Sequence, residues 1–246
     1  MRDPAVVEVV IAEQFRGPPN SGNGGYVCGV LARELAGPAR VVLRAPIALD
    51  TPLQLVRSAD GVRLQDVDGH LIAEGAPGDI AELPEPPPPP SLSVARDAAR
   101  RFVGHGREYH PVCFTCATVL EEGYGLRVFV GQLAGAPAGF VAGAWTPHAN
   151  FGDKAGLAVT EAVWGALDCP GIVAWTEKDG GGGLLGTMTG HILRRPLVGE
   201  ECIVMAWPIE ASGRKRVSGT ALFTGAGEML ARSRQIWIGR VAANQG

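Results

Sequence analysis

The residues Asn23, Gly24 and Gly25 combine features that favour anion binding. They lie in PNSGNGGYVCGVLARELAG (residues 19–37), directly before an apolar run at 26–35 that we expect to be a helix. The first N–H groups of a helix have no partner within it and carry the positive end of its dipole, so glycines there can cradle an oxyanion. A plain turn is the alternative, because glycine is common before helices. Asn23, Gly24 and Gly25 are therefore candidate substrate-binding residues.

A single carboxylate in the second half of the chain is the candidate general base. Asp168 ends the apolar run GLAVTEAVWGALD (residues 156–168), which predicts a buried helix. Partial desolvation raises the pKa of a carboxylate and suits it to accept a proton from water. The alternative is a turn residue, since Pro170 and Gly171 follow and Asp is common in turns. On this pattern the helix ends at Asp168.

A third stretch, HGREYHPVCFTC (residues 105–116), invites a test for metal binding. His105, His110, Cys113 and Cys116 would supply four zinc ligands, and a C-x-x-C pair is a familiar half-site. The two histidines precede the cysteines at a compact spacing without the usual intervening loop. We therefore predict no metal at these four residues and no cofactor, and leave the role of the stretch open.

Composition narrows the classes of partner. The chain has 246 residues, 46% hydrophobic and 19% charged, with a net charge of −3, which argues against a nucleic-acid partner. It contains no apolar run of the roughly 20 residues that span a bilayer and no signal-peptide pattern at its start, so we expect no membrane partner. Five cysteines, an odd number in mostly apolar surroundings, indicate a reduced compartment. We expect a cytoplasmic protein.

The proline-rich stretch ELPEPPPPPS (residues 82–91) divides the chain into two parts with the same plan. Each part has a helical run and several strand-like runs, and RAPIAL and DGHLIAEG in the first part match RRPLVG and AGEMLARS in the second. This pattern predicts a duplicated domain: a first domain at 1–81, a connecting segment at 82–109 and a second domain at 110–246. One helix with about four antiparallel strands predicts an α+β unit, a curved sheet wrapped around a central helix.

Four short motifs carry a resemblance to a known family. GGYVCGVLARELAG, EAVWGALDCPG, RRPLVGE and GEMLARSRQIWI resemble the double hotdog proteins, in particular the acyl-CoA thioesterase II-like group, with some likeness to phenylacetyl-CoA-type thioesterases. The resemblance covers most of the chain. It implies a tandem (double) hotdog, each half a curved antiparallel sheet around a helix. A homodimer is consistent with it, because closed pseudo-dimers often pair again through sheet edges.

The same resemblance implies a catalytic set and a substrate. The family pattern combines an Asp on the second helix with a Thr and a Gln on neighbouring strands, which here correspond to Asp168, Thr187 and Gln235. A shift of the Thr position to Thr189 is an alternative. The start of the first helix, with Asn23, Gly24 and Gly25, would face the Asp as the oxyanion end of the site. This set predicts an acyl-CoA thioesterase-like hydrolase that cleaves a thioester by Asp-assisted attack of water; the alternative is a non-catalytic acyl or CoA binder.

Overall fold

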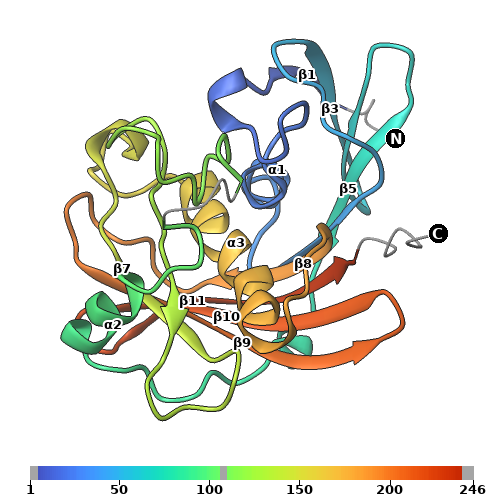
Figure 1. The fold of residues 1–246 in the computed structure, drawn as a ribbon. Helices are drawn as coiled ribbons and strands as arrows, with labels where there is room; N and C mark the ends of the chain where they lie inside the picture. Colours follow the sequence, from blue (N-terminus) through green and yellow to red (C-terminus); the bar gives the residue numbers. More distant parts are fainter. Residues whose placement is uncertain (1–4, 106–109, 240–246) are drawn as a thin grey trace.

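The computed structural model describes residues 5–105 and 110–239 of the chain (Figure 1). These residues form one sheet of eleven strands and three α-helices. The helices are α1 (Gly24–Ala32), α2 (Leu92–Ala99) and α3 (Thr160–Asp179), and short 3-10 turns lie at η1 (Glu13–Phe15), η2 (Ile80–Glu82) and η3 (Ala149–Phe151). The strands are β1 (Ala5–Val10), β2 (Ala39–Leu43), β3 (Pro52–Ser58), β4 (Gly61–Gln65), β5 (Leu71–Pro77), β6 (Gly131–Gln132), β7 (Val141–Trp145), β8 (Leu184–Ile192), β9 (Cys202–Ser212), β10 (Lys215–Thr224) and β11 (Met229–Ile238).

The strand order is the same in both halves of the sheet when each half is read outward from the strands where the two meet. It runs β1-β3-β4-β5-β2-β8-β11-β10-β9-β7-β6, and all neighbouring strands are antiparallel. The first five strands come from the chain before the proline-rich stretch and the other six from the chain after it. The two sets meet where β2 pairs with β8, with Ala39 opposite Gly190 and Val42 opposite Thr187. The predicted α+β class with antiparallel strands is confirmed.

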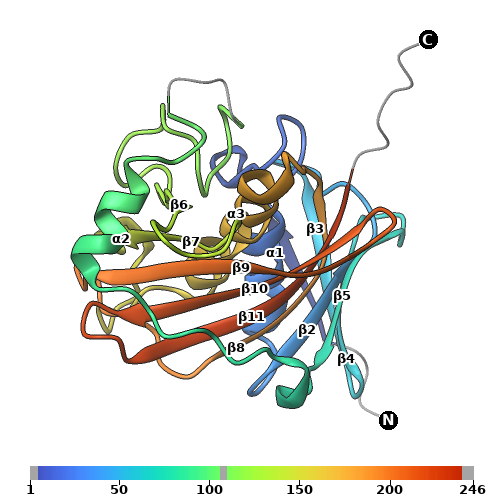
Figure 2. The ribbon, with the colours of Figure 1, turned by 60° about the horizontal axis from the view of Figure 1, so that its bottom comes forward.

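Helices α1 and α3 lie side by side against the sheet (Figures 1 and 2). Glycines allow their close approach: a Cβ at Gly25 would lie 2.4 Å from the Cβ of Asp168, and one at Gly29 would lie 2.5 Å from the Cα of Glu161. Helix α1 packs against β2, β4, β5 and β8, whereas α3 packs mainly against β9, β10, β11 and β7. Neither these helices nor α2 is long and apolar enough to cross a membrane in the described part of the chain.

Helix α3 is longer than the sequence analysis predicts. It begins at Thr160 and continues through Pro170 to Asp179, so Asp168 lies inside the helix and not at its end. Proline has no N–H and interrupts the hydrogen bonds of a helix, which usually favours a break there. Here the surrounding sheet supplies donors to the helix carbonyls: Gln235 donates to the oxygen of Leu167 and Ser218 to that of Gly171. The prediction of a helix end at Asp168 is therefore wrong.

The opposite face of the second half of the sheet is also covered. Helix α2, in the segment predicted only as a connection, packs there against β6, β7 and β9, where Ala95 meets a buried cluster that includes Ile203, Met205 and Trp207. The proline-rich stretch, which precedes α2 in the chain, runs across the strands in Figure 2. Pro89 lies near the turn between β10 and β11, and Glu85 forms an ion pair with Arg232. The second half of the sheet is thus enclosed between α3 and this covering segment.

One of the strand-like runs of the second part does not form a strand. The run GLRVFVG (residues 125–131) is mostly apolar, as a strand often is, but only Gly131 lies in a strand, β6. Two of its backbone N–H groups form hydrogen bonds outside the sheet: Leu126 N–H donates to the carbonyl of Phe114, and Val128 N–H donates to the carbonyl of Thr115. This segment therefore fixes residues 113–116 against the core instead of extending the sheet.

Candidate active site

A cavity of about 600 Å³ opens beside the N-terminal end of α1. Its walls come from both halves of the chain: the segment before α1, the segment after β2, residues of the 110–116 segment, the middle of α3, and the ends of β8 and β11. The polar, sulfur-containing and basic side chains among the lining residues are Asn20, Ser21, Asn23, Arg44, His110, Cys113, Cys116, Asp168 and Cys169. Most of the remaining lining residues are apolar or glycine, so the cavity suits a ligand with a substantial apolar part.

Three of the first four N–H groups of α1 have partners. The side-chain oxygen of Asn23 accepts the N–H of Tyr26 at 2.8 Å and caps the helix, and the carbonyl of Asn23 accepts the N–H of Val27. The N–H of Gly25 donates to Asp168 Oδ2 at 3.0 Å. Within the described residues the N–H of Gly24 makes no hydrogen bond, and Gly24 lines the cavity. It is the donor of this helix end that a ligand in the cavity can use.

Asp168 is a buried carboxylate with one oxygen unpaired. Its side chain lines the cavity, although the residue is only 3% exposed. Oδ2 accepts from Gly25, whereas Oδ1 is buried without a hydrogen-bond partner in the described part of the structure. Burial raises the pKa of Asp168 to about 7, and the hydrogen bond from Gly25 opposes part of that effect. Asp168 thus lies in hydrogen-bond contact with the start of α1.

Residues 113–116 form one wall of the cavity, with Cys113 and Cys116 among the lining residues. Thr115 is fully buried, donates to the carbonyl of Gly165 in α3 and accepts from the side-chain amide of Asn23 at 3.3 Å. The N–H of Phe114 donates to the carbonyl of Arg16, just before α1. These bonds therefore link the start of α1 to the body of α3 beside the cavity.

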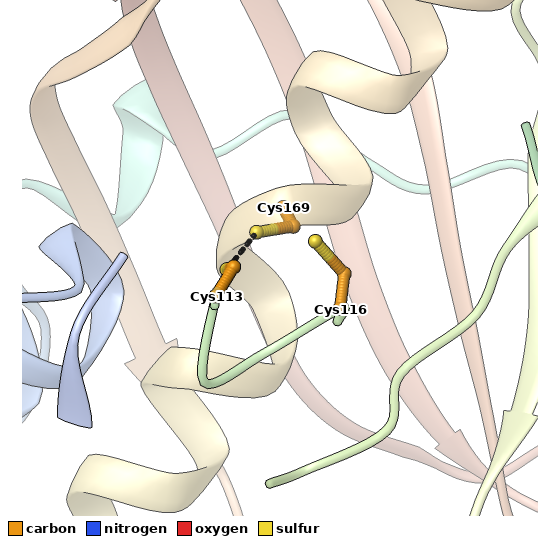
Figure 3. A group of neighbouring side chains, drawn as sticks. All are labelled: Cys113, Cys116 and Cys169. Carbon is orange, nitrogen blue, oxygen red and sulfur yellow. Dashed lines mark hydrogen bonds between the residues drawn. The ribbon is translucent and has the colours of Figure 1, made fainter. Parts of the chain in front are cut away.

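Three cysteines meet in this wall, as Figure 3 shows. Cys113 and Cys116 come from the segment just described and Cys169 from α3; their sulfur atoms all lie within 4.8 Å of one another. The pKa of the Cys113 thiol lies well below its ordinary value, because the thiols of Cys116 and Cys169 donate to it. The same interactions, together with burial, raise the pKa of Cys116 and Cys169. Sequence reasoning missed Cys169, since nothing in the spacing connects it to the C-x-x-C pair.

Gln235 lies behind α3 and not in the cavity. It is fully buried, its amide donates to the carbonyl of Leu167 at 2.6 Å, and its oxygen accepts from the Trp237 ring N–H at 2.9 Å. Leu167 directly precedes Asp168, so Gln235 holds the backbone that carries the carboxylate. Gln235 is thus linked to Asp168 indirectly, through the backbone of the preceding residue, Leu167.

Thr187 is not brought to the cavity. It pairs with Ile236 in β11, whereas its neighbour Met188 pairs with Gln235, whose side chain faces α3. Successive residues of a strand point to opposite faces, so Thr187 points away from α3, and Thr189 shares its face. Neither threonine is among the lining residues. The geometry therefore separates Thr187 from Asp168 and Gln235.

The two histidines of the sequence analysis separate as well. His105 lies near Phe102 and Phe129, with its Nε2 3.1 Å from the carbonyl of Ala99, and it does not line the cavity. His110 lines the cavity but is not one of the three residues whose ligand atoms cluster. The four-residue set considered from the sequence is thus not assembled in the described structure.

Comparisons with known proteins identify the fold. No protein-family model matches the chain, and no curated protein does. Solved structures do match over nearly its whole length. A conserved protein of unknown function with a hotdog fold from Alicyclobacillus acidocaldarius shares 13% identity over 97% of this chain and 94% of its own, with a TM-score of 0.62.

Two further matches bear thioesterase names. A tesB protein from Mycobacterium avium subspecies paratuberculosis shares 12% identity over 96% of this chain and 93% of its own, with a TM-score of 0.60. The acyl-CoA thioesterase II TesB2 from Mycobacterium marinum shares 14% identity over 92% of each chain, with a TM-score of 0.56. The protein therefore has the hotdog fold.

Proposed function

We propose that this protein hydrolyses an acyl-CoA thioester in the cavity, with Asp168 as the general base. The observation that carries the proposal is the unpaired Oδ1 of a buried carboxylate that lines an apolar cavity. A buried polar atom without a partner costs free energy, and it is found mainly where a ligand or water completes it. The thioesterase names of structures with this fold agree with the proposal.

The residues around Asp168 suggest how the reaction would run. Water held by Oδ1 attacks the thioester carbonyl while its proton passes to the carboxylate; the carbon–sulfur bond then breaks and the proton goes to the departing CoA sulfur. Gly25 keeps Oδ2 engaged, so Oδ1 is the oxygen left for the water. The N–H of Gly24 is the donor for the negative charge that develops on the carbonyl oxygen. Asn23 supports the same helix end as its cap.

We assign Gln235 a positioning role. The hydrogen bond from its side-chain amide to the carbonyl of Leu167 fixes α3 at the residue before Asp168. The hydrogen bond from the Trp237 ring N–H fixes the Gln235 side chain. A polar group that is locked in this way on both sides orients the base without touching the substrate. Thr187, on the other face of the sheet, has no part in this proposal.

The repeated strand order supports a tandem hotdog in which each half wraps its sheet around one helix. In this interpretation residues 1–81 and 110–246 are the two hotdog domains and 82–109 connects them. The cavity lies where α1 meets α3, and among the described lining residues only Asp168 of α3 is a carboxylate. We therefore infer one active site for each chain.

Two observations suggest how the chain assembles and where it works. Edge strand β1 exposes Val6 and Val10 by 54% and 50%, an apolar edge that pairing between two copies would cover. A homodimer is therefore our proposal, and sedimentation measures it. All five cysteines are free, which fits a reduced, cytoplasmic setting.

The competing function is binding of an acyl group or CoA without hydrolysis. The positions of Thr187 and Gln235 favour it, because neither of these members of the three-residue set implied by the resemblance lines the cavity, and Thr187 lies away from Asp168 as well. A panel of acyl-CoAs of graded chain length separates the two functions when CoA thiol release and binding are both measured. The hydrolase proposal predicts turnover of at least one chain length. Tight binding without turnover of any member would contradict it and support the binder.

A further inference from the structure

The three cysteines in the cavity wall are the strongest unassigned cluster in the described residues. Cys113, Cys116 and Cys169 are 3%, 1% and 9% exposed, and the Cys113 and Cys169 sulfur atoms are 3.4 Å apart. The three sulfur atoms point toward one another from two separate segments (Figure 3). None of them has a part in the hydrolysis proposed above.

The spacing of the sulfur atoms matches that of a metal site. Zinc binds thiolate sulfur at about 2.3 Å in tetrahedral geometry, which places bound sulfur atoms about 3.8 Å apart. The Cys113 and Cys169 sulfur atoms are 3.4 Å apart and no two of the three are more than 4.8 Å apart, which is close to that value. Small movements of the side chains would bring all three to ligand distance. A disulfide has a sulfur separation of only about 2.05 Å and would leave the third cysteine without a function.

We propose that Cys113, Cys116 and Cys169 bind one zinc ion, with the fourth coordination position facing the cavity. Sites with three protein ligands keep a fourth position for water or a bound molecule, and all three cysteines line the cavity. Cys113 and Cys116 form a C-x-x-C half-site, and α3 supplies the third ligand. The proposal replaces the sequence-based prediction of no metal, because that prediction weighed two histidines and did not include Cys169.

Neighbouring groups hold the proposed ligands in place. The side-chain amide of Asn23 lies 3.9 Å from the Cys113 sulfur, within the range of a hydrogen bond to sulfur. Thr115, between the two cysteines of the half-site, donates to the carbonyl of Gly165 and so ties the half-site to the helix of the third ligand. Such outer contacts orient metal ligands. The open cavity provides the path by which the ion enters.

Metal content tests the proposal directly and independently of hydrolysis. Protein purified under reducing conditions without chelator is analysed for zinc, and metal-free protein is titrated with zinc and with cobalt(II). We expect about one ion per chain and thiolate-to-cobalt charge-transfer absorption. Cys113→Ser, Cys116→Ser and Cys169→Ser lose the ion and the absorption. Cys202→Ser, at a buried cysteine outside the cluster, keeps both.

A second measurement covers variants that do not fold. In the wild-type protein, thiol alkylation followed by mass spectrometry reports each cysteine before and after treatment with a chelator. The proposal predicts that Cys113, Cys116 and Cys169 become reactive together when the metal is removed, while the reactivity of Cys202 does not change. Three results overturn the proposal: wild-type protein that takes up neither metal, a Cys113–Cys169 disulfide in the freshly isolated protein, or unchanged metal content in a folded Cys169→Ser variant.

Discussion

The backbone N–H of Gly25 donates to Asp168 Oδ2 at 3.0 Å, which joins α1 to a carboxylate of α3. The contact is possible only because residue 25 has no side chain: a Cβ there would lie 2.4 Å from the Cβ of Asp168. One glycine therefore lets the two halves approach and satisfies one oxygen of the carboxylate, while the other oxygen has no hydrogen-bond partner in the described residues. Four predictions test this arrangement.

Gly25→Ala is expected to destabilise the protein. The new methyl group would also lie 2.7 Å from the carbonyl of Trp164, so the helices must separate. Overpacking costs about 1–3 kcal/mol, occasionally more, against a gain of about 1 kcal/mol in helix propensity. Because the clash involves backbone and a buried carboxylate, we expect a net loss of about 2 kcal/mol in the free energy of unfolding, measured with urea. Gly182→Ala is the control, since a Cβ there meets nothing within 4 Å. Equal stabilities of the two variants would contradict the close approach.

Gln235→Ala is expected to weaken the support of α3. It leaves the Leu167 carbonyl without its side-chain donor and the Trp237 N–H without its acceptor. Unsatisfied buried groups cost about 1–3 kcal/mol each, so the two groups together predict a loss of about 2–6 kcal/mol in urea unfolding. Hydrolysis should fall less than in Asp168→Asn, because Gln235 acts through the backbone. Gln14→Ala removes only an exposed bond to Tyr124 and should change stability by less than about 0.5 kcal/mol. If both variants behave alike, Gln235 has no positioning role.

The apolar cavity wall is expected to set the affinity for the acyl group. Leu184 lines the cavity and is 53% exposed, so Leu184→Glu should fold normally and place a charge where an apolar chain would bind. We expect a raised KM for long-chain acyl-CoAs and little change in kcat, measured by thiol release. Leu197→Glu is the matched control, since Leu197 is 52% exposed and does not line the cavity. A rise in KM that is equal in both variants would place the acyl group elsewhere.

Local sequence patterns predicted the strands well and tertiary contacts poorly. The alternation of apolar and polar residues in β3 and β4 and the Gly-containing turn between β10 and β11 are properties of adjacent residues, so they can be recognised without the fold. Pro170 misled the prediction of α3, because the donors from Ser218 and Gln235 that accompany the continued helix come from strands about 50 to 70 residues away. The strand predicted at 125–131 failed for a similar reason: its N–H groups bond to Phe114 and Thr115.

The residues of the candidate site also fall into two groups: those with a local sequence signal and those whose position depends on tertiary contacts. Asp168 and the Asn23–Gly25 segment were proposed from local signals, an acid in an apolar run and glycines before a helix, and the structure places Asp168 against Gly25. Thr187 was placed by a resemblance that fixes the strand but not the face, and a shift of one residue reverses the face of a side chain. Cys169 could not be joined to Cys113 and Cys116 from the sequence, since only the packing of α3 against the 113–116 segment brings them together.

The central claim is that Asp168 is the base of a thioester hydrolase, and the kcat of Asp168→Asn tests it most directly. Asn can still accept the N–H of Gly25, so the variant should fold, and its metal content should equal that of the wild type. Loss of the proton acceptor should lower kcat by about 10²–10⁴-fold with little change in KM. Asp153→Asn, which alters a surface pair with Arg195, should leave kcat unchanged. A folded Asp168→Asn variant that keeps the wild-type kcat would contradict the account.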